Sequence, residues 1–344
     1  MKTIDGSLLE GGGAILRLAV GFSVLKQQPI RVTNIRKNRP KPGLKHQHLV
    51  GLQAVSKLCD GKIIGDKLGS EEIEFYPNDF KKNNISVRID TAGSAGLVLQ
   101  TLQLACLFSG QNIDVKILGG ADAGKFAPPV LYLQNVTLKL LQKMGYTVEI
   151  KINKHGFYPV GGGEFEIKIP PCNELKPIVL KEQGSIKTIR GISVASRQLE
   201  KAGVAERQAA SAKKALSDAG DVNIETNYVE SACPGSFIVL WLETDSGAIL
   251  GSDCIGERGL PAHQVGERAA KDLLKAWESG ATVDIHAADQ LIPFMALAGS
   301  ESTIKAPGLS RHAETNIWLS EQFTSSRFCI KKNNKNVEIS CIPK

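Results

Sequence analysis

The sequence predicts an α/β (α+β) protein with a large domain of three repeated units and a smaller inserted α/β domain. Two observations lead to this prediction. Three segments of the 344-residue chain share one order of elements, helix–strand–loop–helix–strand–strand, and residues 184–281 do not fit that order. Repetition of a supersecondary unit indicates units that pack around a shared core. We therefore expect residues 1–183 and 282–344 to form the large domain and residues 184–281 the insert.

Apolar residues at helical spacing and β-branched residues at alternating spacing define the elements of each repeat. In the first repeat we expect helices at 11–26 and 47–59, and strands at 29–35, 61–68 and 71–77. The second repeat has helices at 94–109 and 130–144, and strands at 113–118, 147–152 and 163–169. The third has helices at 289–298 and 312–323, and strands at 302–306, 327–332 and 336–342.

The insert has a different order of elements. We expect strands at 188–196, 222–230, 236–244 and 248–256, with an alanine-rich helix at 205–220 and a second helix at 262–279. Strands and helices in this proportion are typical of a separate α/β domain, placed before the third repeat.

Composition indicates a globular protein that can bury a core, with 42% hydrophobic and 22% charged residues. The seven cysteines are odd in number and form no CxxC pair, which favours reduced thiols over a zinc site or disulfides. No apolar run reaches the ~18 residues of a membrane span, and the N-terminus "MKTIDGSLLEGGG" lacks the apolar run of a signal peptide. We expect a cytoplasmic protein, or a nuclear one in a eukaryote, with no membrane partner. The oligomeric state stays open.

Charge is unevenly distributed along the chain. The net charge is +7, and no Asp or Glu occurs between Glu10 and Asp60, a stretch with nine Lys and Arg residues. The loop 35–49, "IRKNRPKPGLKHQHL", holds Arg36 and Arg39 between prolines and a glycine. Arginine suits bidentate phosphate contacts, so this block favours a phosphate-rich ligand, with a solvated basic loop as the alternative.

Two glycine-rich stretches can be interpreted as phosphate sites. Three glycines precede the helix at 11–26, where backbone N–H groups could cradle phosphate, or where they simply make a tight turn. Glu10 beside them is either a magnesium ligand or a surface acid. The stretch "GGADAGKF" approaches a Walker A motif, but Phe126 replaces the Ser or Thr that binds Mg²⁺, which argues against a P-loop.

His312 is the main candidate for catalysis. Helical spacing places it at the polar end of a stripe made by Thr315, Asn316, Leu319 and Phe323, with Ser310 as the helix cap. The positive end of the helix dipole disfavours imidazolium there, and a neutral imidazole has the lone pair of a nucleophile. A packed, purely structural histidine is the alternative. The loops 36–46, 119–129 and 307–312 occupy equivalent places in the repeats, so a composite site is a further expectation.

Five ordered motifs, "IDGSLLEGGGAILR", "IRKNRPKPGLKHQHL", "HGFYPVGGGE", "ADQLIPFMALAG" and "SRHAETN", resemble the RNA 3′-terminal phosphate cyclase family nearly end to end. The resemblance implies a large domain of three copies of a fold similar to the C-terminal domain of a bacterial translation initiation factor, with a smaller inserted domain. It also implies ATP as substrate, Mg²⁺ or Mn²⁺ as metal, and RNA 3′-phosphate ends as partners.

The implied reaction converts an RNA 3′-phosphate to a 2′,3′-cyclic phosphate through a histidine–AMP intermediate on His312 and an RNA–adenylate. Glu10 matches the family's metal-binding glutamate. The implied nucleotide contacts are Arg17, Arg36, Arg39, Gln47, Gln100, Pro128, Tyr132, His286, Ala287, Ala288, Asp289 and Gln290. Pro128 and Tyr132 fall where the family packs the adenine.

Two other functions compete with this interpretation. One is a non-catalytic, RNA-binding ribosome-assembly factor of the same fold, a branch that lacks the histidine retained here in "SRHAETN". The other is a nucleotidyltransferase or ligase that uses lysine, which the absence of a KxDG motif disfavours.

Overall fold

Each of the first two repeats begins one strand earlier than the sequence predicts. The computed structural model describes residues 1–125 and 127–343. The first repeat comprises β1 (Lys2–Asp5), α1 (Gly13–Leu25), β2 (Ile30–Thr33), α2 (His46–Cys59), β3 (Lys62–Ile64) and β4 (Ile73–Tyr76). The second comprises β5 (Asn84–Ser94), α3 (Ala95–Ala105), β6 (Ile113–Ala121), α4 (Val130–Tyr132), a π-turn (Leu133–Thr137), α5 (Leu138–Lys143), β7 (Glu149–Lys154) and β8 (Glu164–Ile169).

The third repeat comprises α8 (Ile285–Met295), β13 (Ser302–Ala306), α9 (Arg311–Phe323), β14 (Arg327–Lys332) and β15 (Val337–Ile342). Its first helix starts four residues before the predicted start at 289, because the Asp284 side chain accepts hydrogen bonds from the backbone N–H groups of His286 and Ala287. The other helices and strands of the repeats are confirmed within a few residues of their predicted bounds.

The sheets of the three repeats have one topology. Their strand orders are β1-β2-β4-β3, β5-β6-β8-β7 and β13-β15-β14. The first pair in each four-stranded sheet is parallel, and the other pairs are antiparallel. In the third repeat Val179 forms a parallel bridge with Thr303 of β13. The place of the leading strand is therefore held by a single bridge, contributed by the segment that precedes the insert.

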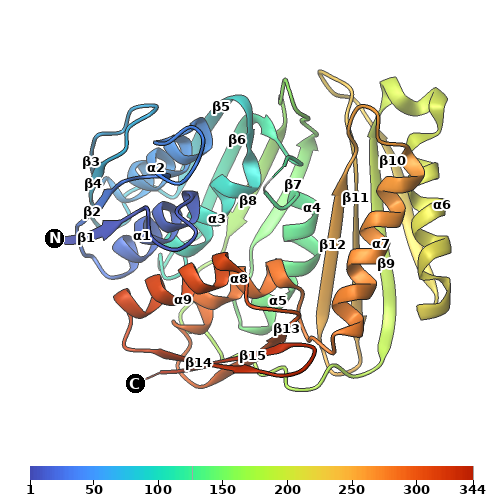
Figure 1. The fold of residues 1–344 in the computed structure, drawn as a ribbon. Helices are drawn as coiled ribbons and strands as arrows, with labels where there is room; N and C mark the ends of the chain where they lie inside the picture. Colours follow the sequence, from blue (N-terminus) through green and yellow to red (C-terminus); the bar gives the residue numbers. More distant parts are fainter. Residues whose placement is uncertain (126, 344) are drawn as a thin grey trace.

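The helices of the repeats lie in the middle of the large domain and the sheets lie around them (Figure 1). Helix α1 packs against α2, α3 and α9, and α8 packs against α9. The strands bury one face only. In β5, for example, Ile85, Val87 and Ile89 are buried and the residues between them are exposed, as expected of a sheet with one solvated face. This arrangement brings helix N-termini from different repeats together.

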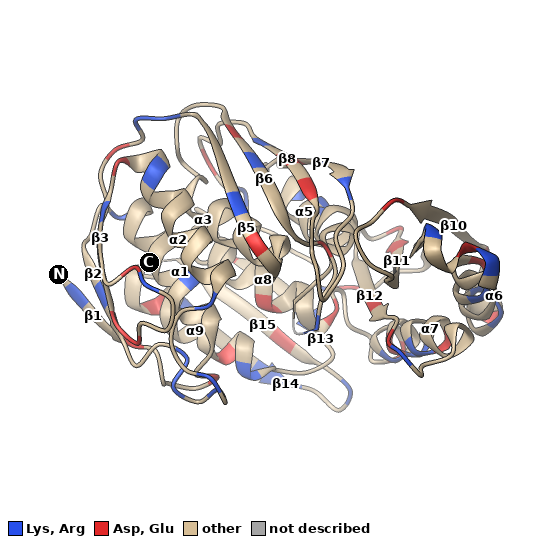
Figure 2. Ribbon diagram, turned by 90° about the horizontal axis from the view of Figure 1, so that it is seen from above, with Lys and Arg blue, Asp and Glu red and all other residues tan. Residues whose placement is uncertain are grey.

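The inserted elements are β9 (Ile186–Ser196), a 3₁₀ turn (Arg197–Ala202), α6 (Val204–Leu216), a second 3₁₀ turn (Ser217–Ala219), β10 (Val222–Val229), β11 (Ser236–Thr244), β12 (Ile249–Ile255) and α7 (Ala262–Glu278). The sheet order is β10-β9-β11-β12. Figure 2 shows this unit at one end of the molecule, away from both chain termini.

We propose the domain bounds 1–183 with 282–344, and 184–281, and the burial pattern supports them. A second core cluster draws all its buried members from residues 189–281. Strand β11 is buried on both faces: Ile238, Leu240 and Leu242 join this second core, whereas Phe237, Val239 and Trp241 join the core of the large domain. The insert therefore packs its sheet against the repeats and keeps α6 and α7 on the opposite face.

Two exclusions made from the sequence can be compared with the described residues. The seven cysteines are free, and no described helix is both long and apolar enough to cross a membrane. The next helix after the Walker-like stretch, α4, starts only at Val130, and Lys125 forms an ion pair with Glu257 (2.9 Å). Phe126, which carried the argument against a P-loop, lies outside the described residues.

Candidate functional site

The N-terminus of α9 holds His312 at the protein surface. The Ser310 hydroxyl accepts a hydrogen bond from the Ala313 N–H (2.9 Å) and so caps the helix as predicted. Thr315 and Asn316, one turn further, are buried, while the His312 side chain is 48% exposed. The helix thus packs through one face and leaves the imidazole half-exposed at its first turn. His312 is not a packed core histidine.

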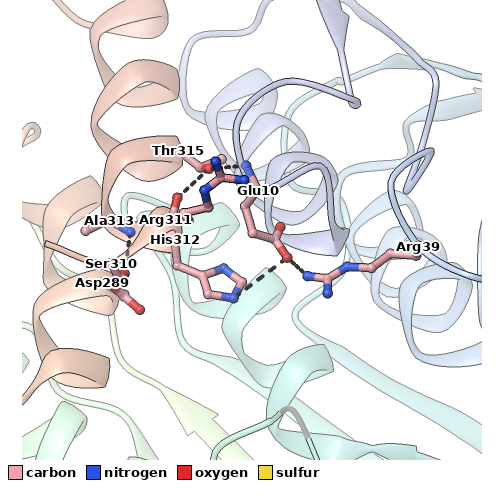
Figure 3. A network of polar contacts seen from close by, with 8 residues as sticks. All are labelled: Glu10, Arg39, Asp289, Ser310, Arg311, His312, Ala313 and Thr315. Atoms are coloured by element: carbon pink, nitrogen blue, oxygen red, sulfur yellow. Dashed lines mark hydrogen bonds and ion pairs between the residues drawn. The ribbon is translucent and has the colours of Figure 1, made fainter.

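Glu10 lies between His312 and Arg39, as Figure 3 shows. Its Oε1 atom is 3.8 Å from His312 Nε2 and forms an ion pair with the Arg39 guanidinium. The Glu10 side chain is only 6% exposed, and its backbone N–H donates to the Thr315 hydroxyl (3.2 Å). These contacts join the loop before α1, the basic loop before α2 and the start of α9. Two of the three loops expected to form a composite site therefore meet here.

The three glycines before α1 make room for this arrangement. A Cβ atom built on Gly12 would overlap the Glu10 carboxylate, and one built on Gly13 would overlap the His48 ring. Gly11 has a φ of +60° and faces the Asn38 side chain, whose amide donates to the Ser7 carbonyl (2.7 Å). Each glycine thus allows a polar side chain of the site to approach the backbone. The turn therefore shapes the site, and phosphate binding by the N–H groups of these glycines stays a prediction.

His312 is neutral at physiological pH. Burial lowers its pKa to about 4, and the positive charges of Arg17 and Arg39, with His286, lower it further. The sequence predicted the direction from the helix dipole, but desolvation and the arginines are the main causes in the structure. An uncharged imidazole keeps a free nitrogen lone pair.

Arg17 and His48 form the floor of the site. Burial lowers the pKa of Arg17 to about 10, so the guanidinium stays charged. Burial also lowers the pKa of His48 to about 3, aided by the charges of Arg17, Arg36 and Lys45. His48 Nδ1 accepts a hydrogen bond from the Lys45 N–H (3.2 Å), and its Nε2 faces Gly13. Sequence reasoning did not select His48, although its place at the start of a helix beside the basic loop was visible in "KHQHL".

Glu10 has the surroundings of a metal ligand. Within residues 1–125 and 127–343, its buried Oε2 atom has no hydrogen-bond partner, whereas Oε1 is paired with Arg39. No group of three His, Cys, Asp or Glu residues in the described chain could hold a metal by itself. A single carboxylate completed by substrate phosphates is a usual way of binding Mg²⁺. Glu10 fits that role.

Three further residues predicted to contact the nucleotide, Arg36, Gln47 and Gln100, differ from one another in their surroundings. Arg36 adopts a φ of +56°, and its Nη1 donates to the carbonyls of Lys41 (2.7 Å) and Gly43 (2.9 Å). Arg36 therefore shapes the basic loop with this nitrogen. Gln47 lies at the start of α2, with its Oε1 3.0 Å from the position of a Cβ on Gly93. Gln100 lies on α3, partly exposed.

Two side chains of the segment 286–290, those of His286 and Asp289, lie near the start of α9. Asp289 accepts a hydrogen bond from the Ser310 hydroxyl, and its carbonyl accepts from the Asn316 amide (2.6 Å). Burial raises the pKa of Asp289 to about 7. His286 is exposed beside it. Gln290 accepts a hydrogen bond from the Thr137 hydroxyl (3.1 Å), and Ala287 and Ala288 are buried. Contacts of these three residues with a nucleotide stay predictions.

The expected packing of Tyr132 against an adenine does not match this structure. Its ring is fully buried against Gly251 of the insert, and its hydroxyl donates to Asp284 Oδ1 (2.7 Å). Asp284 in turn caps α8. Tyr132 therefore positions the segment 286–290 indirectly. Pro128, four residues earlier, is partly exposed and stays a candidate for the adenine contact.

Comparison with known proteins identifies the family of this chain. A profile of the family "RNA 3′-terminal phosphate cyclase" matches residues 8–330. A protein named RNA 3′-terminal phosphate cyclase from Methanosarcina barkeri is 43% identical over 342 residues, which is 99% of both chains. One of the same name from Thermococcus onnurineus is 46% identical over 95% of both chains, and one from Methanopyrus kandleri is 42% identical over 93% of this chain and 92% of its own. With the repeats, the insert and the histidine site all in place, this chain belongs to the RNA 3′-terminal phosphate cyclase family.

Proposed function

We propose that this protein converts RNA 3′-phosphate ends to 2′,3′-cyclic phosphates at the expense of ATP, with His312 as the nucleophile. The observation that carries the proposal is the meeting of a neutral, exposed imidazole with Glu10 and Arg39. A nucleophile, a carboxylate suited to a metal and a phosphate-binding cation are the groups that nucleotidyl transfer requires.

In the first step His312 Nε2 attacks the α-phosphorus of ATP. We assign this nitrogen because it is the one that faces Glu10. The P–N bond forms as the bond to the bridging oxygen of pyrophosphate breaks, and pyrophosphate leaves. Arg39 and Arg17 balance the charge that develops on the phosphate oxygens. The product is a phosphoramidate between His312 and AMP.

In the second and third steps AMP passes to RNA and then leaves. An oxygen of the RNA 3′-phosphate attacks the AMP phosphorus, and the bond to His312 breaks. The neighbouring 2′-OH then attacks the 3′-phosphorus, loses its proton, and displaces AMP as the cyclic phosphate forms. The ribose itself holds the 2′-OH next to its target, so little extra positioning is needed.

A bound Mg²⁺ or Mn²⁺ would supply Lewis-acid stabilisation of phosphate oxygens. Glu10 is the residue proposed to hold it, together with oxygens of ATP. Arg39 forms an ion pair with the same carboxylate. We therefore expect its guanidinium to move toward the phosphates when ATP and the metal bind. The basic loop is proposed to bind the RNA backbone, and affinity for RNA should then fall as salt rises.

The exposed His312, which the non-catalytic branch lacks, argues against the alternative of a non-catalytic RNA-binding factor. A direct test incubates an RNA bearing a labelled 3′-phosphate with the protein, ATP and Mg²⁺. The expected product carries a terminal phosphate that resists phosphatase, and it forms only when ATP is present. Formation of that product by a His312→Ala variant would contradict the proposal.

A further inference from the structure

The loop between β7 and β8, residues 155–163, has no part in the chemistry proposed above. It reads "HGFYPVGGG" and contains two adjacent aromatic residues with opposite surroundings. Phe157 is 3% exposed, whereas Tyr158 is 76% exposed, and Val160 next to it is also exposed. Tyr158, Pro159 and Val160 thus form a short exposed apolar run on an ordered loop, and such contiguous exposure can mark a ligand surface.

The loop is held in one conformation from both sides. On the side of the second repeat, Asp122 contacts His155 Nδ1 (2.5 Å) and accepts from the Gly156 N–H (3.1 Å). Within the loop, the Gly161 N–H donates to the Phe157 carbonyl (2.6 Å).

On the side of the insert, the Phe157 ring packs against Phe237, with ring centroids 6.2 Å apart. The Cys233 thiol also donates to the Phe157 carbonyl (3.3 Å). The backbone that carries Tyr158 is therefore ordered before any ligand binds, which lowers the entropy cost of using the ring as a contact.

A short series of backbone contacts connects this loop with the nucleotide site. A Cβ on Gly161 would lie 2.8 Å from the Thr91 carbonyl and 3.0 Å from the Gly120 carbonyl. A Cβ on Gly120 would in turn lie 2.8 Å from the Gly93 carbonyl, and one on Gly93 would lie 3.0 Å from Gln47 Oε1. Gln47 is the second residue of α2, next to His48. The loop that carries Tyr158 therefore packs, through Gly120 and Gly93, against Gln47 at the edge of the site that contains Arg17 and His312.

We propose that Tyr158 is a stacking platform for a base of single-stranded RNA, one or a few nucleotides before the 3′-phosphate. The inference rests on the proposed function, because it assigns the direction in which the RNA leaves the site. An aromatic face accepts any base, and the exposed Lys154 beside the loop can neutralise a phosphate. One exposed ring in a run of only three exposed apolar residues, with a neighbouring cation, suits a nucleotide better than it suits a protein partner, which needs a broader apolar surface.

The test compares Tyr158→Ala with Tyr158→Phe, which keeps the ring. Phe108→Ala is the matched control. Phe108 is also an exposed aromatic residue, but it lies just after the C-terminal end of α3. The measurements are the KM for 3′-phosphorylated oligonucleotides of increasing length, the rate of protein adenylation with ATP alone, and the fluorescence of 2-aminopurine placed at successive positions before the 3′ end.

We expect Tyr158→Ala to raise the KM for longer oligonucleotides by about tenfold, with no change for a mononucleotide substrate. Quenching of 2-aminopurine at one position should be lost in this variant. Tyr158→Phe and Phe108→Ala should match the unmodified protein, and adenylation should be unchanged in all three. Because Tyr158 is exposed, its replacement should not affect folding, and Tyr158→Gln gives a second variant without a ring.

Equal KM values for Tyr158→Ala and the unmodified protein at every length would overturn the inference. A raised KM with unaltered 2-aminopurine quenching would also overturn it, because stacking would not be the cause. Failure of the unmodified protein to form an adenylate would refute the proposed function, whereas the 2-aminopurine signal would still test Tyr158.

Discussion

Glu10 Oε1 lies 3.8 Å from Nε2 of His312, although the two residues come from opposite ends of the chain. The repeated topology explains this proximity, because α1 of the first repeat packs against α9 of the third. The same carboxylate meets Arg39 from the basic loop. A residue pair from two repeats thus defines the centre of the site.

Replacing Glu10 with Gln should impair adenylation through the metal. The amide keeps the size of the side chain but loses the charge that would hold Mg²⁺. We expect the Mg²⁺ concentration for half-maximal adenylation to rise by at least about tenfold, a cost near 1.4 kcal/mol. Glu314→Gln is the control, because Glu314 is an exposed acid on the first turn of α9, the turn that carries His312. Equal metal dependence in both variants would remove Glu10 from the metal site.

Gly12→Ala should reduce adenylation without unfolding the protein. Gly12 has a φ of −113° that any residue can adopt, but a Cβ there would overlap the Glu10 carboxylate. The carboxylate must therefore shift, and we expect a loss of adenylation rate of about tenfold or more. Gly308→Ala is the matched control, because a Cβ at Gly308 meets no atom within 4 Å. A normal rate in Gly12→Ala would show that the position of the carboxylate is not critical.

The pH dependence of adenylation should follow the pKa of His312. Its folded value of about 4 is below the ordinary 6.5, so the neutral, nucleophilic form prevails at any pH well above 4. Protonation of His312 should therefore not reduce the adenylation rate between about pH 8 and 5, and the rate should fall only below about pH 5. In Arg39→Gln one positive charge is removed, and the acid limb should move up toward 6.5. An acid limb at the same pH in Arg39→Gln would mean that the charge of Arg39 does not lower the pKa of His312.

Tyr132→Phe should destabilise the protein but leave the use of ATP unchanged. The hydroxyl is one of several donors to the buried Asp284, which also accepts from the backbone N–H groups of Gly251, His286 and Ala287. Losing one buried hydrogen bond to a carboxylate costs about 1–3 kcal/mol. Thermal melting measures this cost, and Tyr158→Phe is the exposed control. A raised KM for ATP with unchanged stability would instead support the direct contact between Tyr132 and the adenine that the family resemblance implies.

The helices and most strands could be predicted from the sequence because their periodicity is local. The leading strands β1 and β5 were missed for different reasons. β1 has only four residues, Lys2–Asp5, too few to show an alternation. β5 does alternate, but it runs directly into α3 through Ser94, and no turn residue separates the two elements.

For the site, motif resemblance selected His312, Glu10 and Arg39, and the structure brings them together. It did not separate residues that face a ligand from those that support them. Tyr132, Ala287 and Ala288 are buried, and whether a residue in a motif is buried depends on packing between the insert and the repeats. The role of His48 likewise depends on its approach to Gly13, a contact between two helices that spacing along the chain does not reveal.

Peptide mass spectrometry of the protein after incubation with ATP and Mg²⁺ tests the central claim most directly. The proposed mechanism predicts one added AMP on the peptide that contains His312, labile to acid and absent from His312→Ala. Glu314→Ala, two residues further along α9, should carry the same adduct as the unmodified protein. AMP attached to a lysine, or an adduct that persists in His312→Ala, would contradict the account.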